Sequence, residues 1–108
     1  MDLRLEDPPA AGVVLVAIGG EVDFVAAGIL ERFLLGALAE QRHAKPGLII
    51  DLSDAEFFGC AGVNALIAAQ RRLEAGGGWL RLVDPSPAVS RVLDAAGMNT
   101  RLRVTDSS

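Results

Sequence analysis

The chain has 108 residues, 51% of them hydrophobic and 22% charged, which fits one folded domain rather than a disordered segment. Fourteen acidic and ten basic side chains give a net charge of −4, which argues against a nucleic-acid partner because such proteins present a basic face. One cysteine and one histidine exclude an internal disulfide and a tetrahedral zinc site of the usual kind, and they disfavour an enzyme.

No targeting or membrane segment is predicted. The first seven residues, MDLRLED, lack the basic stretch followed by an apolar one that marks a secretory signal. The uncharged stretch 8–20 contains glycines and a proline pair and is too short to cross a bilayer. We therefore expect a cytoplasmic protein that does not associate with membranes.

The first third of the chain predicts two strands and a helix. Residues 13–18 form a short β-branched apolar run that ends at Gly19-Gly20, which is typical of a buried strand. Residues 1–5 alternate polar and apolar and are expected to pair with that run as an edge strand. Asp23 is a candidate cap for the helix that follows. Its apolar face is expected to comprise Ile29, Leu30, Phe33, Leu34, Ala37 and Leu38.

The middle of the chain repeats this alternation of strand and helix. Pro46-Gly47 introduces a buried strand over 48–52, and 53–59 is expected to be a loop. A second helix begins at about Cys60 and ends at the triple glycine 76–78. Its expected apolar stripe comprises Val63, Leu66, Ile67 and Leu73.

The last third predicts a strand over 79–83, with Trp79 more suited to the core than to a binding surface. Ser86 followed by Pro87 is typical of a helix start, and Gly97 closes that helix. A short strand over 101–104 and a tail from about 105 complete the chain. The alternation predicts a single α/β domain over 1–108, with a central mixed sheet and helices packed on it.

The most informative segment is 51–66, where a helix begins directly after a strand and loop. The free N–H groups of such a helix point outward, and a glycine-rich corner lets a partner approach closely. The segment reads DLSxAxFFxxxGVxxL. Two others accompany it: GEVD at 20–23, and LVDPSPAVSRVL at 82–93 followed by GM at 97–98.

Together these three segments resemble the STAS domain, the fold of bacterial anti-sigma factor antagonists. The resemblance implies a protein that docks on an anti-sigma factor of the serine-kinase ATPase type and so frees a sigma factor. In that family the kinase phosphorylates a serine in an Asp-Ser-Ser/Thr-Gly stretch at the start of the second helix. The added phosphate carries about two negative charges and breaks the complex.

This sequence departs from the family at that point, since it reads Gly59-Cys60-Ala61 where the family carries its serine. Cys60 stands at the phosphoacceptor position, so we expect no switching by serine phosphorylation there. Two interpretations of Cys60 compete. A helix N-terminus stabilises a thiolate and would suit a thiol switch, whereas a free cysteine often serves simply as a small apolar residue.

Other candidate groups carry weaker signals. His43 is interpreted as a solvated histidine at a helix end. The acidic trio Asp51, Asp54 and Glu56 lacks the further ligands of a magnesium site, so we expect neither a metal nor a cofactor. Ser53 is the alternative phosphorylation site.

The predicted function is therefore docking on an anti-sigma factor without catalysis, by a monomer or weak dimer. The docking surface is expected to comprise Asp23, Phe58, Gly59, Cys60, Ala61, Gly62 and Asn64. The alternative is a STAS domain that senses a nucleotide or other small molecule, or that serves as a subunit of a transporter or stress-signalling complex.

Overall fold

The computed structural model describes residues 1–41, 45–95, 97 and 103–105. Strands and helices alternate along most of this chain, as the hydrophobic periodicity predicts. In chain order the elements are β1 (Asp2–Glu6), β2 (Val13–Val22), α1 (Phe24–Ala39), β3 (Gly47–Asp51), β4 (Ala55–Phe58), α2 (Cys60–Ala75), β5 (Trp79–Val83), α3 (Pro87–Ala95) and β6 (Arg103–Thr105).

The strands form one mixed sheet in the order β1-β2-β3-β5-β6. The edge strand β1 runs antiparallel to β2, and the other neighbours in this order are parallel. The short strand β4 lies outside the order and pairs in parallel with the last residues of β2, beyond a bulge between Gly20 and Glu21. The predicted α/β domain with a mixed sheet is confirmed.

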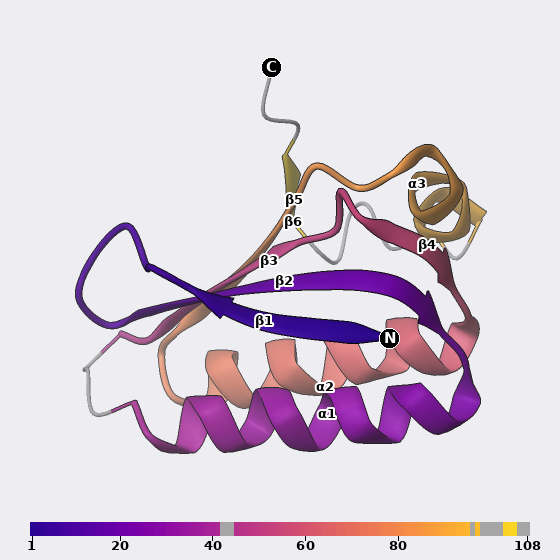
Figure 1. Cartoon of the computed structure of the whole chain (residues 1–108). Coiled ribbons are helices and arrows are strands. Elements are labelled where there is room, and N and C mark those ends of the chain that lie inside the picture. Colours follow the sequence, from indigo (N-terminus) through magenta and orange to yellow (C-terminus); the bar gives the residue numbers. More distant parts are fainter. Residues whose placement is uncertain (42–44, 96, 98–102, 106–108) are drawn as a thin grey trace.

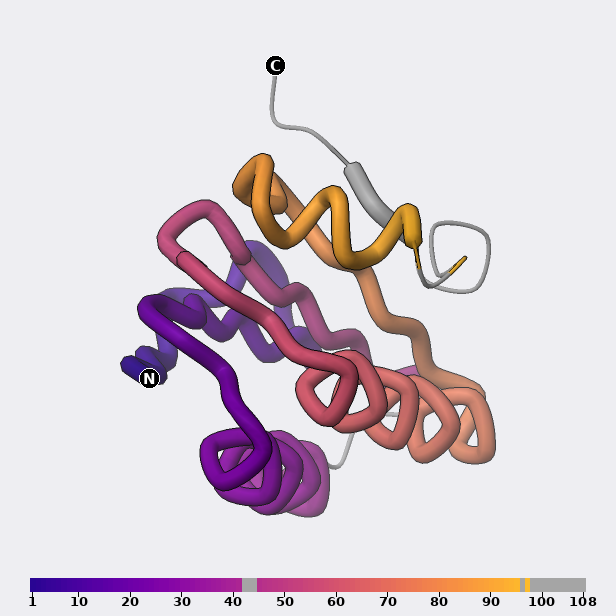
Figure 2. Tube along the Cα trace, turned by 90° about the vertical axis from the view of Figure 1, so that its right-hand side faces the viewer, coloured from indigo at the N-terminus to yellow at the C-terminus, as the bar shows by residue number. Residues whose placement is uncertain are grey.

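The sheet separates two helical layers. Helices α1 and α2 lie side by side on one face, and α3 lies on the other face beside β4 (Figures 1 and 2). Alternate strand residues such as Val16, Ile50 and Leu82 point at α1 and α2, which present buried residues such as Leu30 and Leu66. Periods of two in the strands and about 3.6 in the helices thus meet in one apolar core.

Several local predictions are confirmed by hydrogen bonds. Asp23 caps α1, since its Oδ1 accepts from the N–H of Ala26 at 2.8 Å. The end of α2 is closed by Gly76 and Gly78, whose N–H groups both donate to the carbonyl of Leu73. Ser86 caps α3 by accepting from the N–H of Val89 at 3.4 Å.

Two predictions around β2 and β4 are wrong. Gly20 does not end β2: its φ of +76° creates a bulge, and the strand continues to Val22. Residues 53–59, predicted as a loop, contain β4. This strand has only four residues, with Ala55 and Phe58 buried and the two between them exposed, so it lacks the alternation that marks a strand in sequence.

Trp79 was expected in the core, and this expectation is also wrong. Its side chain is 37% exposed on the sheet face away from α1 and α2, because it is the first residue of β5 and alternates with buried Leu80. The indole lies over Gly47 of the neighbouring strand, and the guanidinium of Arg81 sits 5.6 Å from the ring centroid.

The C-terminal strand is found at Arg103–Thr105, one residue beyond its predicted end. The predicted start of that strand at 101–102 and the tail at 106–108 lie outside the described residues. Within the part of the chain that the structure describes, no helix is both long and apolar enough to cross a bilayer.

Candidate functional site

Helices α1 and α2 begin next to each other, at the right-hand end of Figure 1, where β4 also lies. A hydrogen bond fixes this arrangement: the N–H of Gly59 donates to the carbonyl of Val22 at 3.0 Å. Asp23 directly follows Val22, and Cys60 directly follows Gly59. The structure therefore brings together two residues, Asp23 and Cys60, that are 37 positions apart in sequence and were both predicted as site residues.

The two helix starts differ chemically. Asp23 supplies a carboxylate that accepts from the first turn of α1 and remains exposed. Gly59 is the N-cap of α2 and has no side chain to accept from that helix. Cys60 is exposed at the first position of α2. Because free N–H groups and the helix dipole favour negative charge there, the N–H groups at the start of α2 can donate to a hydrogen-bond acceptor from outside.

The predicted docking residues divide into exposed and buried groups. Asp23, Cys60 and Asn64 are exposed, and Gly59 and Ala61 are partly buried. Phe58 and Gly62 were predicted as contact residues, and the structure corrects this: Phe58 is fully buried and Gly62 is also buried.

The burial of Gly62 has a direct physical cause. It faces the core side of α2, where a Cβ built on it would lie 2.6 Å from Cε1 of Phe58 and 3.0 Å from Cγ1 of Val22. Glycine at this position therefore lets α2 pack closely against the sheet. Phe58 and Gly62 therefore lie beneath the predicted docking surface and are not accessible on it.

Sequence reasoning missed a set of exposed apolar side chains at the same end. Phe24 is 84% exposed, Val25 72% and Ile29 47%, and all three line an open groove between α1 and α2. The sequence pattern predicts Ile29 on the buried face of α1, and this prediction is wrong. The signal was present in the sequence, because Val25 and Ile29 form an i, i+4 row separate from the buried row of Ala27, Leu30, Leu34 and Leu38.

Phe57 adds a fourth exposed apolar side chain beside the start of α2. It is 48% exposed, and its ring lies 3.4 Å from a Cβ built on Gly59. Its neighbour Phe58 points the opposite way into the core. Two adjacent phenylalanines therefore serve different purposes, one for the core and one for the surface next to Cys60.

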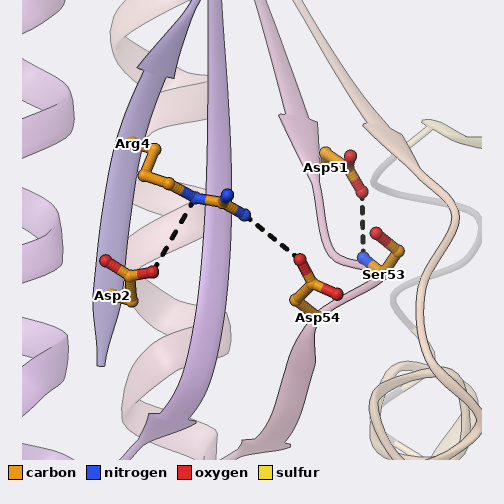
Figure 3. A network of polar contacts seen from close by, with 5 residues as sticks. All are labelled: Asp2, Arg4, Asp51, Ser53 and Asp54. Atoms are coloured by element: carbon orange, nitrogen blue, oxygen red, sulfur yellow. Dashed lines mark hydrogen bonds and ion pairs between the residues drawn. The ribbon is translucent and has the colours of Figure 1, made fainter.

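Two of the three acidic residues considered for a magnesium site, Asp51 and Asp54, make contacts that hold local structure (Figure 3). Oδ1 of Asp51 accepts from the N–H of Ser53 at 2.9 Å. Oδ2 of Asp54 lies 3.1 Å from Nη2 of Arg4, whose Nε is 3.7 Å from Asp2. Among the residues the structure describes, no group of three His, Cys, Asp or Glu side chains is arranged to hold a metal ion.

The remaining sequence candidates are Ser53 and His43. Ser53 is exposed in the turn between β3 and β4. His43 lies outside the described residues.

The sequence model of the STAS domain family matches residues 5–108 of this chain. The chain belongs to the STAS domain family. It is 23% identical over 107 residues to the anti-sigma F factor antagonist of Paenibacillus polymyxa, covering 99% of this chain and 90% of that protein. The resemblance inferred from the three sequence segments is therefore confirmed at the level of the family.

Solved structures agree with this assignment. The anti-sigma factor antagonist from Mycobacterium paratuberculosis superposes with a TM-score of 0.80 at 31% identity, over 96% of this chain and 84% of that one. The unphosphorylated form of the anti-sigma factor antagonist SpoIIAA gives a TM-score of 0.83 at 23% identity, over 99% of this chain and 89% of that one. At the latter identity the similarity establishes the shared fold.

Proposed function

We propose that this protein is an anti-sigma factor antagonist that binds its anti-sigma factor through the adjoining starts of α1 and α2. The observation that carries the proposal is the exposure of Asp23, Cys60 and Asn64 on one surface. The names of its relatives point to the class of partner. The site resembles a docking surface more than a catalytic centre, so the proposed activity is binding. The proposed partner is a cytoplasmic anti-sigma factor of the kinase type.

Cys60 bears on how this binding is controlled. By the resemblance to the family it takes the place of the phosphorylated serine, and its flanking residues Gly59 and Ala61 have no hydroxyl group. A kinase that transfers phosphate to serine therefore meets no acceptor at the start of α2. The protein then remains competent to bind when a serine-bearing relative would be phosphorylated and released.

Binding to purified anti-sigma factors of the kinase type from the protein's own genome, measured by isothermal titration calorimetry, tests the proposal. We expect the wild-type chain to bind one of them and Cys60→Glu, which places a permanent negative charge on the surface, to weaken that binding by about a hundredfold. Ala75→Glu is the matched control, because it adds the same charge at the exposed far end of the same helix.

Equal affinities for the wild type and Ala75→Glu, with a loss confined to Cys60→Glu, would place the contact at the start of α2. Failure of every anti-sigma factor to bind the folded wild-type chain would overturn the proposed function. Equal loss in both variants would show that total charge rather than the site controls binding, which would also contradict the proposal.

A further inference from the structure

Strand β1 forms one edge of the sheet. Its partner β2 pairs with one side of its backbone, and among the described residues no strand pairs with the other side (Figure 1). The outward N–H and C=O groups of such an edge are a template for a further strand. Helix α1 lies beneath the sheet and does not extend past the edge that β1 forms, so a strand from another molecule can approach it (Figure 2).

One face of β1 is apolar and incompletely covered. Leu3 and Leu5 lie opposite the buried Ile18 and Val16 of β2, so they point to the sheet face on which α1 and α2 pack. Leu5 is nevertheless 63% exposed, and Met1, one residue before the strand, is 40% exposed. The apolar side chains at this edge therefore retain surface that a second chain could bury.

The other face of β1 carries charges of both signs. Asp2 and Arg4 lie opposite Gly19 and Ala17 of β2, on the sheet face away from α1 and α2. Arg4 is 3.7 Å from Asp2 and 3.1 Å from Asp54, and all three side chains are at least half exposed. Ion pairs this exposed contribute little to stability, so they do not prevent Asp2 and Arg4 from contacting a second chain.

The order of these side chains is self-complementary. Residues 1–5 read MDLRL, which is apolar, acidic, apolar, basic and apolar. When two such strands run antiparallel with the Leu3 side chains of the two copies opposite each other, Asp2 of each copy lies opposite Arg4 of the other, and Met1 lies opposite Leu5. Side chains directly opposite are about 4.5–5.5 Å apart, so each of these pairs attracts.

Two other alignments of this edge bring like charges together. A parallel alignment in register would place Asp2 beside Asp2 and Arg4 beside Arg4. An antiparallel alignment centred on Arg4 would place the two guanidinium groups opposite each other and Asp2 opposite Glu6. Like charges directly opposite destabilise a strand pair, so both alignments are disfavoured.

An antiparallel alignment centred on Leu5 is the nearest competitor. It pairs Arg4 with Glu6 of the other copy, but it brings Pro8, which has no N–H to donate, into the pairing opposite Asp2. The alignment centred on residue 3 avoids this fault and pairs every charge within residues 1–5 with its opposite.

We infer that β1 pairs with β1 of a second copy of this chain, antiparallel and centred on Leu3, and so joins two sheets edge to edge. The contact is small beside a standard interface of about 1,600 Å², so a weak dimer that depends on concentration is expected. The inference concerns the sheet edge rather than the starts of α1 and α2, and it does not depend on the proposed function.

Sedimentation equilibrium of the full chain between about 10 and 500 µM measures the association. The mass should rise towards that of two chains. Arg4→Asp puts like charges opposite each other twice in the contact and should raise the dissociation constant about tenfold or more. Asp2→Arg combined with Arg4→Asp restores the opposite pairs and should associate within about threefold of the wild type. Both variants lose the ion pair with Asp54, so the difference between them reports the pairing between chains.

Arg71→Asp is the matched control for net charge, because Arg71 is exposed on α2 rather than on β1. It should leave the dissociation constant unchanged. A wild-type chain that keeps the mass of one copy throughout the concentration range would overturn the inference. Equal weakening by Arg4→Asp and by the double variant, or by Arg4→Asp and by Arg71→Asp, would overturn it as well.

A disulfide experiment tests the alignment. In a chain that also carries Cys60→Ala, Leu3→Cys brings two thiols opposite each other at a separation that a disulfide can span, whereas Leu5→Cys places each thiol opposite Met1. In a glutathione redox buffer, Leu3→Cys should form linked dimers and Leu5→Cys should remain mostly unlinked. Preferential linking through Leu5→Cys would move the centre of the contact and overturn the proposed alignment. Equal linking of both variants would show that the strands have no fixed alignment and would also contradict it.

Discussion

The indole ring of Trp79 occupies the space that a side chain on Gly47 would require. The two residues face each other across the β3–β5 ladder, and the three atoms nearest to a Cβ built on Gly47 all belong to that ring. Glycine at this position lets an aromatic side chain lie flat across a neighbouring strand. The packing of Trp79 therefore depends on the absence of a side chain opposite it.

We predict that Gly47→Ala destabilises the domain by about 1–3 kcal/mol, because the indole must leave its position over β3. Urea unfolding followed by far-UV circular dichroism measures the change. Gly36→Ala is the matched control: it lies in the exposed interior of α1 with nothing within 4 Å of a built Cβ. That substitution should stabilise the domain by about 0.5–1 kcal/mol. Effects of the same sign at both positions would contradict this account of Trp79.

Gly62→Val should destabilise the domain by about 1–3 kcal/mol, because its side chain would enter the space held by Phe58 and Val22. Thermal unfolding measures the loss. Asn64→Ala, an exposed change on the same helix, should alter stability by no more than about 0.5 kcal/mol. Reduced partner binding by Asn64→Ala would thus report a lost contact, whereas reduced binding by Gly62→Val would include partial unfolding. A Gly62→Val variant as stable as the wild type would refute the packing role assigned to Gly62.

Cys60→Ser is expected to restore phosphorylation, because it returns a hydroxyl to the exposed first position of α2. Incubation with a kinase-type anti-sigma factor and ATP, followed by peptide mass spectrometry, should find phosphate at residue 60 in this variant only. Cys60→Ala serves as the negative control. Phosphate close to residue 60 in the wild-type chain would show that the start of α2 does contain an acceptor and would contradict the proposal. Phosphate at Ser53 would move the switch to the turn between β3 and β4.

Asp23→Ala should cost about 1 kcal/mol of stability, because the first turn of α1 loses the acceptor for the N–H of Ala26. Asp23→Asn should cost much less, since the amide oxygen can accept the same hydrogen bond. Chemical denaturation of both variants separates the cap from the charge. A loss of equal size in both would mean that the negative charge itself, rather than the hydrogen bond, stabilises the start of α1.

The fold could be predicted from sequence where local pattern and tertiary role coincide. The apolar run at 13–18, the cap at Asp23 and the Ser86-Pro87 helix start each have a local cause that the structure retains. Strand β4 was not predicted because it pairs with β2 beyond the bulge at Gly20. The residues of β4 itself, 55–58, carry no pattern that indicates this pairing.

The candidate site was only partly predictable for a related reason. Proximity of Asp23 and Cys60 followed from the resemblance to the family, but the exposure of each neighbour depends on which way its side chain points in the packed domain. Phe57 and Phe58 are the same residue type, but the side chain of Phe57 is exposed and that of Phe58 is buried. The exposed row of Val25 and Ile29 differs from the buried row of α1 only by its rotation about the helix axis.

The chain contains one cysteine, Cys60, and one tryptophan, Trp79. The two residues lie at opposite ends of the sheet. Trp79 starts β5 opposite the start of β3, whereas Cys60 starts a helix of 16 residues, about 24 Å long, at the end where the parallel strands finish. A fluorophore attached to the single thiol would receive excitation energy from the single indole. The natural sequence thus supplies a donor and an attachment point for an acceptor, and the efficiency of transfer would follow the separation of the two ends during unfolding without any engineered residue.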